Sequence, residues 1–262
     1  MSACALMLVR DEADIIGTTV RHLLSQVEEV LVLDNLSRDG TSDILHALAQ
    51  ETGRVQVIPD PEPAYWQSRK LTALAAEALA RGHAWAVPCD ADEVWYSAQG
   101  RVGDLLADLG PAVYVVTALV YDHVPTGADP AGELDPVRRI GWRRPEPCPL
   151  PKVACRLAPG LVIEQGNHGA HYPGPVTRAE NVLTVRHFPN RSEDRFLAKA
   201  RVGAEAYRLT DLPYEVGRHW RDYGQILELH GEEGLRQVWR QWFFAPDPHA
   251  AGLVYDPAPA QA

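Results

Sequence analysis

The sequence predicts an α/β fold, in which a mixed, mostly parallel sheet is flanked by helices and followed by a helical C-terminal extension. Two observations predict it. Short apolar runs alternate with segments of helical spacing over residues 3–88, which is typical of parallel strands joined by helices that cover both faces of a sheet. From Ser192 to Phe244 the apolar residues recur at helical spacing.

The expected elements follow in order along the chain. Strands are expected at residues 3–9, 30–33, 55–58 and 84–87, separated by helices at 13–25, 41–50 and 68–81. Further strands are expected at 113–120, 152–157 and 182–188, and the Pro- and Gly-rich segment 121–151 is interpreted as a long loop and candidate lid. Helices are expected at 192–208, 215–229 and 232–244, before a Pro- and Ala-rich tail.

The composition is that of an ordinary globular protein. The chain has 262 residues, of which 46% are hydrophobic and 23% charged, and its formal net charge is −10. This acidic balance argues against a nucleic-acid partner, because phosphate backbones require a broad basic face. No run approaches the ~18 apolar residues of a membrane span, and no secretory signal is evident, so we expect a cytoplasmic protein without a transmembrane segment. The four cysteines form no C-x-x-C pair, which fits buried thiols in a reducing compartment.

Acidic residues follow each of the first four expected strands. In sheets of this kind, ligands bind outside the carboxyl ends of the strands. The segments at that edge are 10–12, 34–35, 60 and 90–92. A packed core gives no reason for this pattern, so the edge is interpreted as a ligand site.

The most pronounced local feature is the run of three carboxylates Asp90, Asp92 and Glu93 after the fourth strand. Like charges this close repel one another, so their burial requires a compensating cation. Carboxylates favour hard ions such as Mg²⁺ or Mn²⁺, which often share their coordination sphere with substrate phosphates. The alternative is a solvated acidic turn.

A second feature is the turn that follows the second strand, which begins at Asp34 and ends at Thr41. A carboxylate at this position can accept hydrogen bonds from a base N–H or a ribose hydroxyl. We favour a ligand role for Asp34, whereas Asp39 and Gly40 also fit an ordinary strand-to-helix turn.

Together the segments 9–16, 34–41 and 89–95 resemble glycosyltransferase family 2, whose members have a GT-A fold. The similarity extends to a bacterial subgroup with an Asp-Ala-Asp-Glu metal motif and a downstream His-aromatic-Pro segment, matched by His187–Pro189. Two positions depart from the family pattern: Asp11 stands where asparagine is more frequent, and Leu36 stands where glycine or another small residue is usual.

The resemblance implies a donor site for a nucleotide sugar. Glu12 and Asp34 would contact base and ribose, and Arg69 would reach the diphosphate or the donor sugar. Asp90 would touch ribose or metal, and Asp92 would ligate the metal. The other residues expected in this site are Arg10, Asn35, Ala91 and, behind the metal, Glu93.

The resemblance also implies a Mn²⁺ or Mg²⁺ cofactor and one further metal ligand from downstream. Imidazole suits Mn²⁺ better than Mg²⁺. His187 is the first candidate, because a strand delivers it just before a turn; His168 is the second and His171 the third. Arg191 and Lys199 are candidates for facing the diphosphate.

The predicted activity is transfer of a hexose from a UDP- or GDP-type donor to a small-molecule, glycan or lipid-linked acceptor. The metal at Asp92 would stabilise the departing diphosphate. The resemblance favours inversion, which requires a carboxylate base, and the candidates for this catalytic base are Glu164 and Asp122. Candidate sugar-stacking residues are Trp66, Trp95, Trp142 and Trp220.

This interpretation divides the chain by role. Residues 1–112 would bind the donor, 113–190 would form the acceptor side of the same domain, 191–245 would add C-terminal helices, and 246–262 would form an irregular tail. Three alternatives stay open. A nucleotidyltransferase would be expected to carry a Gly-rich basic loop after the first strand, a non-catalytic nucleotide- or sugar-binding module would have no need of Asp90 and Asp92, and a hydrolase would release free sugar.

Overall fold

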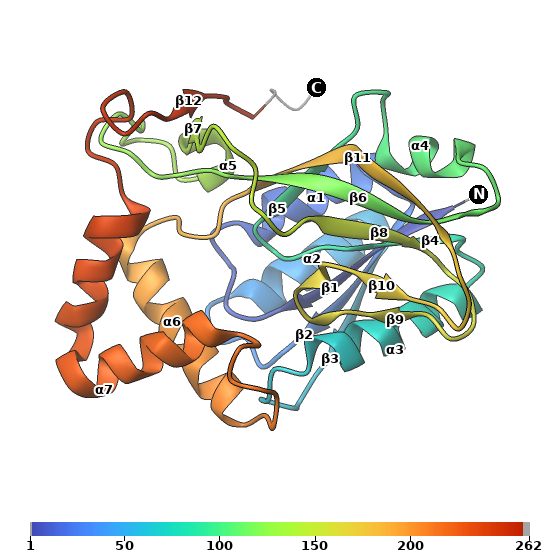
Figure 1. The fold of residues 1–262 in the computed structure, drawn as a ribbon, viewed down its shortest axis with the longest axis horizontal. Helices are drawn as coiled ribbons and strands as arrows, with labels where there is room; N and C mark the ends of the chain where they lie inside the picture. Colours follow the sequence, from blue (N-terminus) through green and yellow to red (C-terminus); the bar gives the residue numbers. More distant parts are fainter. Residues whose placement is uncertain (1, 259–262) are drawn as a thin grey trace.

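The computed structural model describes residues 2–258, which contain an eight-stranded mixed sheet of order β3-β2-β1-β4-β8-β6-β11-β5 (Figure 1). The expected α/β sheet flanked by helices is therefore confirmed. Parallel pairing joins β1 to β2 and β4, and β2 to β3. These strands are β1 (Ala3–Val9), β2 (Glu29–Asp34), β3 (Val55–Pro59) and β4 (Trp85–Pro88).

The other half of the sheet reverses direction at β8. This strand is antiparallel to both β4 and β6, β11 runs parallel to β6, and β5 closes the edge antiparallel to β11. Strand β5 was not expected, because its residues were interpreted as part of the acidic motif. The strands are β5 (Glu93–Tyr96), β6 (Val113–Asp122), β8 (Lys152–Arg156) and β11 (Thr177–His187).

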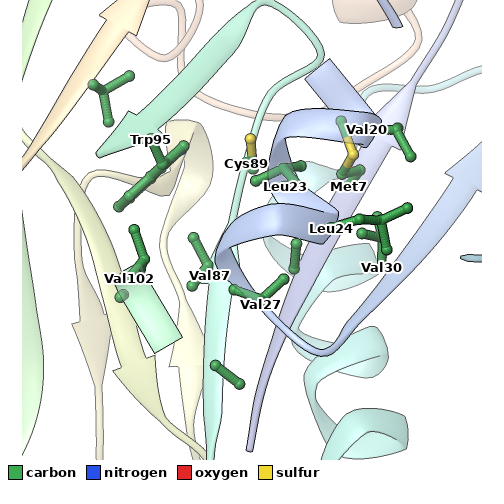
Figure 2. Packing of buried hydrophobic residues seen from close by; sticks show 14 of the residues in the cluster. Met7, Val20, Leu23, Leu24, Val27, Val30, Val87, Cys89, Trp95 and Val102 are labelled. Atoms are coloured by element: carbon green, nitrogen blue, oxygen red, sulfur yellow. The ribbon is translucent and has the colours of Figure 1, made fainter. Parts of the chain in front are cut away.

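Helices cover both faces of the sheet because the residues of β1 alternate between them. Met7 faces α1 (Ile16–Gln26), whose Val20, Leu23 and Leu24 surround it in Figure 2. Helices α2 (Thr41–Thr52) and α4 (Val102–Asp108) pack on this same face. Leu6 points to the other face and packs with α3 (Gln67–Ala80). The expected helices are confirmed to within a few residues.

Short elements occupy the segment expected to be a loop. It contains α5 (Pro136–Arg139) and β7 (Trp142–Arg143), and β7 pairs with β12 (Val254–Tyr255) near the C-terminus. A small hairpin lies beside α3 and consists of β9 (Val162–Ile163), the 3₁₀ turn η1 (Gln165–Asn167) and β10 (Ala170–His171).

The C-terminal helices form a separate pair at one side of the sheet (Figure 1). Helix α6 (Glu193–Arg208) begins at Ser192, whose side chain accepts a hydrogen bond from Arg195 N. Helix α7 (Arg218–Val238) is broken at Gly231, where φ is 62°, and continues as the π-helix η2 (Trp239–Phe243). None of the helices in residues 2–258 combines the length and apolar character needed to cross a bilayer.

Asp11 and Leu36 adopt left-handed backbone conformations, with φ of 55° and 60°. Asparagine and glycine tolerate this region better than other residues. The two departures from the family pattern therefore fall at positions where the backbone itself favours the more frequent residue types.

Candidate active site

The topology brings the charged residues of the chain to one edge of the sheet. The carboxyl ends of β1, β2, β4, β6 and β11 lie at this edge, because β4 and β6 are both antiparallel to β8 and β11 is parallel to β6. Strands β8 and β5 run the other way and begin there, at Lys152 and Glu93. Asp34, Asp122 and His187 end their strands at the same edge.

Asp92 lies at the centre of this edge with 2% of its surface exposed. Its Oδ2 accepts a hydrogen bond from the Lys199 ammonium and lies 3.6 Å from Arg191 Nη1. Its Oδ1 lies 3.6 Å from His187 Nε2. Burial alone would raise the pKa of Asp92, but the charges of Lys199, His187 and Arg191 hold it far below its usual range. Asp92 is therefore an ionised, buried carboxylate.

His187 is oriented by Asp122. The Nδ1 atom of the imidazole lies 2.7 Å from Asp122 Oδ1, so Nε2 is the nitrogen directed at Asp92. Burial would lower the pKa of His187, but the hydrogen bond to Asp122 and the charge of Asp92 raise it above its ordinary value. A carboxylate behind one imidazole nitrogen is the usual support for a histidine that binds a metal through the other.

Asp90 belongs to a different group of contacts. Lys152, which is 5% exposed, places its ammonium 2.5 Å from Asp90 Oδ2 and 2.7 Å from Glu93 Oε1. The other oxygen of Asp90 accepts hydrogen bonds from Gln67 Nε2 at 2.9 Å and Asn167 Nδ2 at 3.2 Å. The protein's own cations lie beside the crowded carboxylates: Lys152 contacts Asp90 and Glu93, and Lys199 and Arg191 lie beside Asp92.

Arg191 connects the first strand to the C-terminal helices. Its guanidinium hydrogen-bonds Glu12 and Asp14, the latter at 2.7 Å, and is 2% exposed as a residue. The Lys199 ammonium contacts Asp92 and lies 3.6 Å from a carboxylate oxygen of Glu12. Glu12, expected at the base and ribose, is thus held within the protein by the two cations.

The profile of the family described as glycosyl transferase family 2 matches residues 4–144, more than half of the chain. The chain belongs to this family. The match includes the strand ends that carry Asp34, Asp90, Asp92 and Asp122, and it stops before the residues that supply His187 and the lysines.

Two solved structures are similar in outline to this family 2 chain. A mannosyltransferase, PcManGT from Pyrobaculum calidifontis, in complex with GDP-Man and Mn²⁺, is 15% identical over 91% of this chain and 73% of its own, with a TM-score of 0.44. A protein described as a glucose-1-phosphate thymidylyltransferase from Bacillus anthracis, in complex with sucrose, is 10% identical over 94% and 86%, with a TM-score of 0.34. No curated protein matched the sequence. At these scores neither likeness carries an argument about activity.

The remaining residues expected at the donor lie at the ends of β1 and β2 in this family 2 chain. Asp34 is half-buried and accepts a hydrogen bond from Ser37 N at 3.3 Å. Asn35 is buried and its amide donates to Asp60 and to the carbonyl of Glu62, so it ties β2 to the following segment. The Arg10 Nε is buried without a hydrogen bond among the described residues.

Two further expected residues have contacts of other kinds. Arg69 is exposed and pairs with Glu62, and its guanidinium lies 5.3 Å from the ring centre of Trp66. Ala91 is buried, and its carbonyl accepts a hydrogen bond from Thr19 Oγ1 at 2.7 Å, which anchors the acidic turn to α1. Asp92 is therefore held in place by the backbone that precedes it.

The hairpin formed by β9 and β10 contacts Asp90 through one residue, and the site residues expected in it have partners elsewhere. Glu164 pairs with His171 at 2.5 Å, and His168 Nδ1 lies 2.9 Å from the carbonyl of Pro151. Within residues 2–258 neither Glu164 nor His168 makes a hydrogen bond or ion pair with Asp92 or His187. The residue of this turn that reaches Asp90 is Asn167.

The one group of three or more potential ligands in the described part of the chain with atoms within 4.8 Å of one another is Cys4, Glu29 and His83. It lies at the opposite edge of the sheet, where β1 and β2 begin. At the acidic edge the structure brings Asp92 and His187 together, and leaves Asp90 outside that pair. It also corrects one expectation: Trp95 is fully buried and donates to Glu93, so it offers no face to a sugar.

Three residues that contact Asp90 were not expected there from the sequence: Lys152, Gln67 and Asn167. A signal existed for Lys152, since a lysine that begins an otherwise apolar strand needs a partner when it is buried. No comparable signal points to Asn167, because the left-handed backbone of Gly166 and Asn167 is a feature of the fold.

Proposed function

We propose that this chain transfers a sugar from a nucleoside diphosphate donor of the UDP or GDP type to an acceptor hydroxyl, with the help of a divalent cation held by Asp92 and His187. The observation that carries the proposal is the 3.6 Å approach of His187 Nε2 to Asp92 Oδ1, with Nδ1 fixed by Asp122. This pair lies where strand ends meet in a chain of glycosyl transferase family 2.

The side chains available as metal ligands fit an ion of the Mn²⁺ type. One buried carboxylate and one imidazole are ligands that Mn²⁺ accepts, and two protein ligands leave positions for phosphate oxygens and water. When bound, the cation would neutralise the diphosphate as it leaves. Asp122 then acts as a positioning residue for His187, not as the base that removes the acceptor proton.

Lys199 and Arg191 are the cations that compensate Asp92 before a metal arrives. A divalent ion on Asp92 would compete with the Lys199 ammonium, which sits on a flexible four-carbon stem. The released ammonium would be free to bind a phosphate oxygen of the donor. Asp34 and Asp90 are proposed as contacts of the nucleoside, with Asp90 held in place by Lys152 at 2.5 Å.

We further propose that transfer proceeds with inversion and takes a hexose. Glu164 is the proposed base, since its carboxylate is partly exposed beside the turn that reaches Asp90. A Glu164→Gln variant is expected to keep donor binding and to lose transfer. Loss of donor binding in this variant would assign Glu164 to a structural role instead.

The decisive experiment compares His187→Gln with His168→Gln, the second histidine expected at the metal. Calorimetry with UDP and GDP, with and without Mn²⁺, measures the nucleotide affinity of each variant. His187→Gln should lose the Mn²⁺-dependent part of the affinity, about tenfold or more, and His168→Gln should keep it. Equal binding with and without metal in the wild type and in His187→Gln would remove the metal role. Product analysis then distinguishes transfer from release of free sugar.

A further inference from the structure

A pocket with a volume of about 520 Å³ opens beside Arg191. Its walls come from the segment after β6, from the start of α6, and from the end of the C-terminal helices. None of the residues proposed for the nucleoside, Asp34 and Asp90 among them, lines it. The pocket shares Arg191 with the Asp92 site, since the Arg191 guanidinium lies 3.6 Å from Asp92, so the pocket adjoins the proposed metal site.

The pocket is built before any ligand arrives. Gly127 N donates to the carbonyl of Ala245 at 3.0 Å, and Ala245 N donates to the carbonyl of Pro125 at 3.1 Å. A Cβ on Gly127 would lie 2.3 Å from the Pro246 carbonyl oxygen, so only glycine allows this close contact. The wall after β6 is thus fastened to the segment that follows η2.

The acids that line the pocket are already engaged. Both oxygens of Asp129 accept hydrogen bonds from Thr126, from its amide at 3.1 Å and its hydroxyl at 2.7 Å. Glu193 pairs with Arg236. Burial raises the pKa of Asp129 and the charge of Arg139 opposes that rise, so these two groups interact although they form no ion pair.

One arginine of the lining, Arg139, forms no ion pair with the described residues. Arg139 donates a hydrogen bond to the carbonyl of Arg191 at 2.9 Å, and no carboxylate among the described residues lies within ion-pair distance of its guanidinium. Arg240 also lines the pocket and is held by Glu233 in an exposed pair, which is easily exchanged. In a chain of net charge −10, this wall is locally suited to an anion.

Aromatic surface completes the pocket. Trp239 and Phe244 line it together with the arginines, and their rings stack on each other with centroids 6.4 Å apart. Apolar walls with a few charged groups are typical of small-molecule sites, and the volume suits a monosaccharide or a disaccharide.

We propose that this pocket binds the acceptor, and that Arg139 selects an acceptor sugar bearing a carboxylate or phosphate group. This inference rests on the proposed function of the neighbouring site. The guanidinium forms two parallel hydrogen bonds with either anion, which is the arrangement that arginine favours. Phe244, which is partly exposed and is backed by the buried Trp239, offers an apolar surface to the face of the sugar ring.

The test uses the full chain with glucose, glucuronate and glucose 6-phosphate as probes. Saturation-transfer NMR measures their binding to the wild type, to Arg139→Gln and to Arg138→Gln. Arg138 is a matched control, because it precedes Arg139 on α5 but is exposed and pairs with Asp135 outside the pocket. Glucuronate or glucose 6-phosphate should bind at least about tenfold more tightly than glucose, and the preference should vanish in Arg139→Gln alone.

The outcomes distinguish failure of the acceptor proposal from failure of the proposed donor site. Stronger binding of glucuronate identifies a carboxylate, and stronger binding of glucose 6-phosphate identifies a phosphate; either supports the proposal. Equal binding of all three sugars, no binding of either anion, or equal losses in both arginine variants would overturn it. Mn²⁺-dependent UDP or GDP binding is measured on the same samples. If that binding persists, the donor site stands although the acceptor proposal has failed.

Discussion

Replacing Lys199 by methionine tests whether this lysine and a divalent cation compete for Asp92. The ammonium contacts Asp92 and lies 3.6 Å from Glu12, and the side chain is 29% exposed. Two unit charges about 4 Å apart interact by about 4 kcal/mol at an effective dielectric constant of about 20. Because the lysine is partly solvated and can move away, we expect a smaller effect of about 1.4 to 2.8 kcal/mol, which corresponds to ten- to hundredfold tighter Mn²⁺ binding.

Electron paramagnetic resonance of free Mn²⁺ measures this affinity directly, without donor or acceptor. The matched control is Arg201→Met, which removes an exposed cation on the same helix that pairs with Glu232. With nucleoside diphosphate added, Lys199→Met should weaken nucleotide binding although it strengthens metal binding, because the variant lacks the ammonium that would bind phosphate in the wild type. Unchanged or weaker Mn²⁺ binding in a folded Lys199→Met protein would refute the competition.

Three further predictions concern buried groups. Asp122→Asn should weaken Mn²⁺ binding by about ten- to hundredfold, because the imidazole of His187 loses the carboxylate that orients it, and the same spectroscopy would contradict this by finding the wild-type affinity. Burial lowers the pKa of His123 to about 4, so the unfolded chain binds its proton first, and stability is lost as pH falls from about 6.5 towards 4. The free energies of unfolding of wild type and His123→Phe, measured with urea, should therefore diverge by about 3 kcal/mol over this pH range. Parallel pH dependences would exclude the effect. Lys70 and Asp60 form a buried pair at 2.6 Å, so Lys70→Met should lower the free energy of unfolding by about 3–5 kcal/mol. Adding Asp60→Asn should recover part of this loss, and simple additivity of the two losses would contradict the pairing.

Much of the fold was predictable because the strands of the first half are continuous apolar runs buried on both faces. The strand at residues 3–9 was placed with its bounds correct, and the helix expected at 192–208 was placed to within one residue. Strand β5 was missed because its first residue, Glu93, was assigned to the acidic motif. A strand that begins with a buried carboxylate depends on a distant partner, here Lys152, so the local sequence pattern does not predict the strand.

The acids of the site were also predictable, since they follow strands whose direction could be inferred. Their partners were not. The partner of Asp90 lies 62 residues further along the chain, and Lys199 lies 107 residues from Asp92. Such pairs are set by the reversal of the sheet at β8 and by the return of α6, which are tertiary features. Lys199 was expected to face a diphosphate, whereas in this structure it contacts Asp92.

The position of α6 along the chain has a consequence for synthesis. During translation, Glu12 and Asp92 leave the ribosome well before Arg191 and Lys199, so a nascent chain that ends at β11 lacks the cations that pair with these two acids in the complete fold. Uncompensated charges of this kind oppose compaction. We therefore expect the carboxyl ends of the amino-terminal strands to reach their final packing only after α6 has emerged from the ribosome.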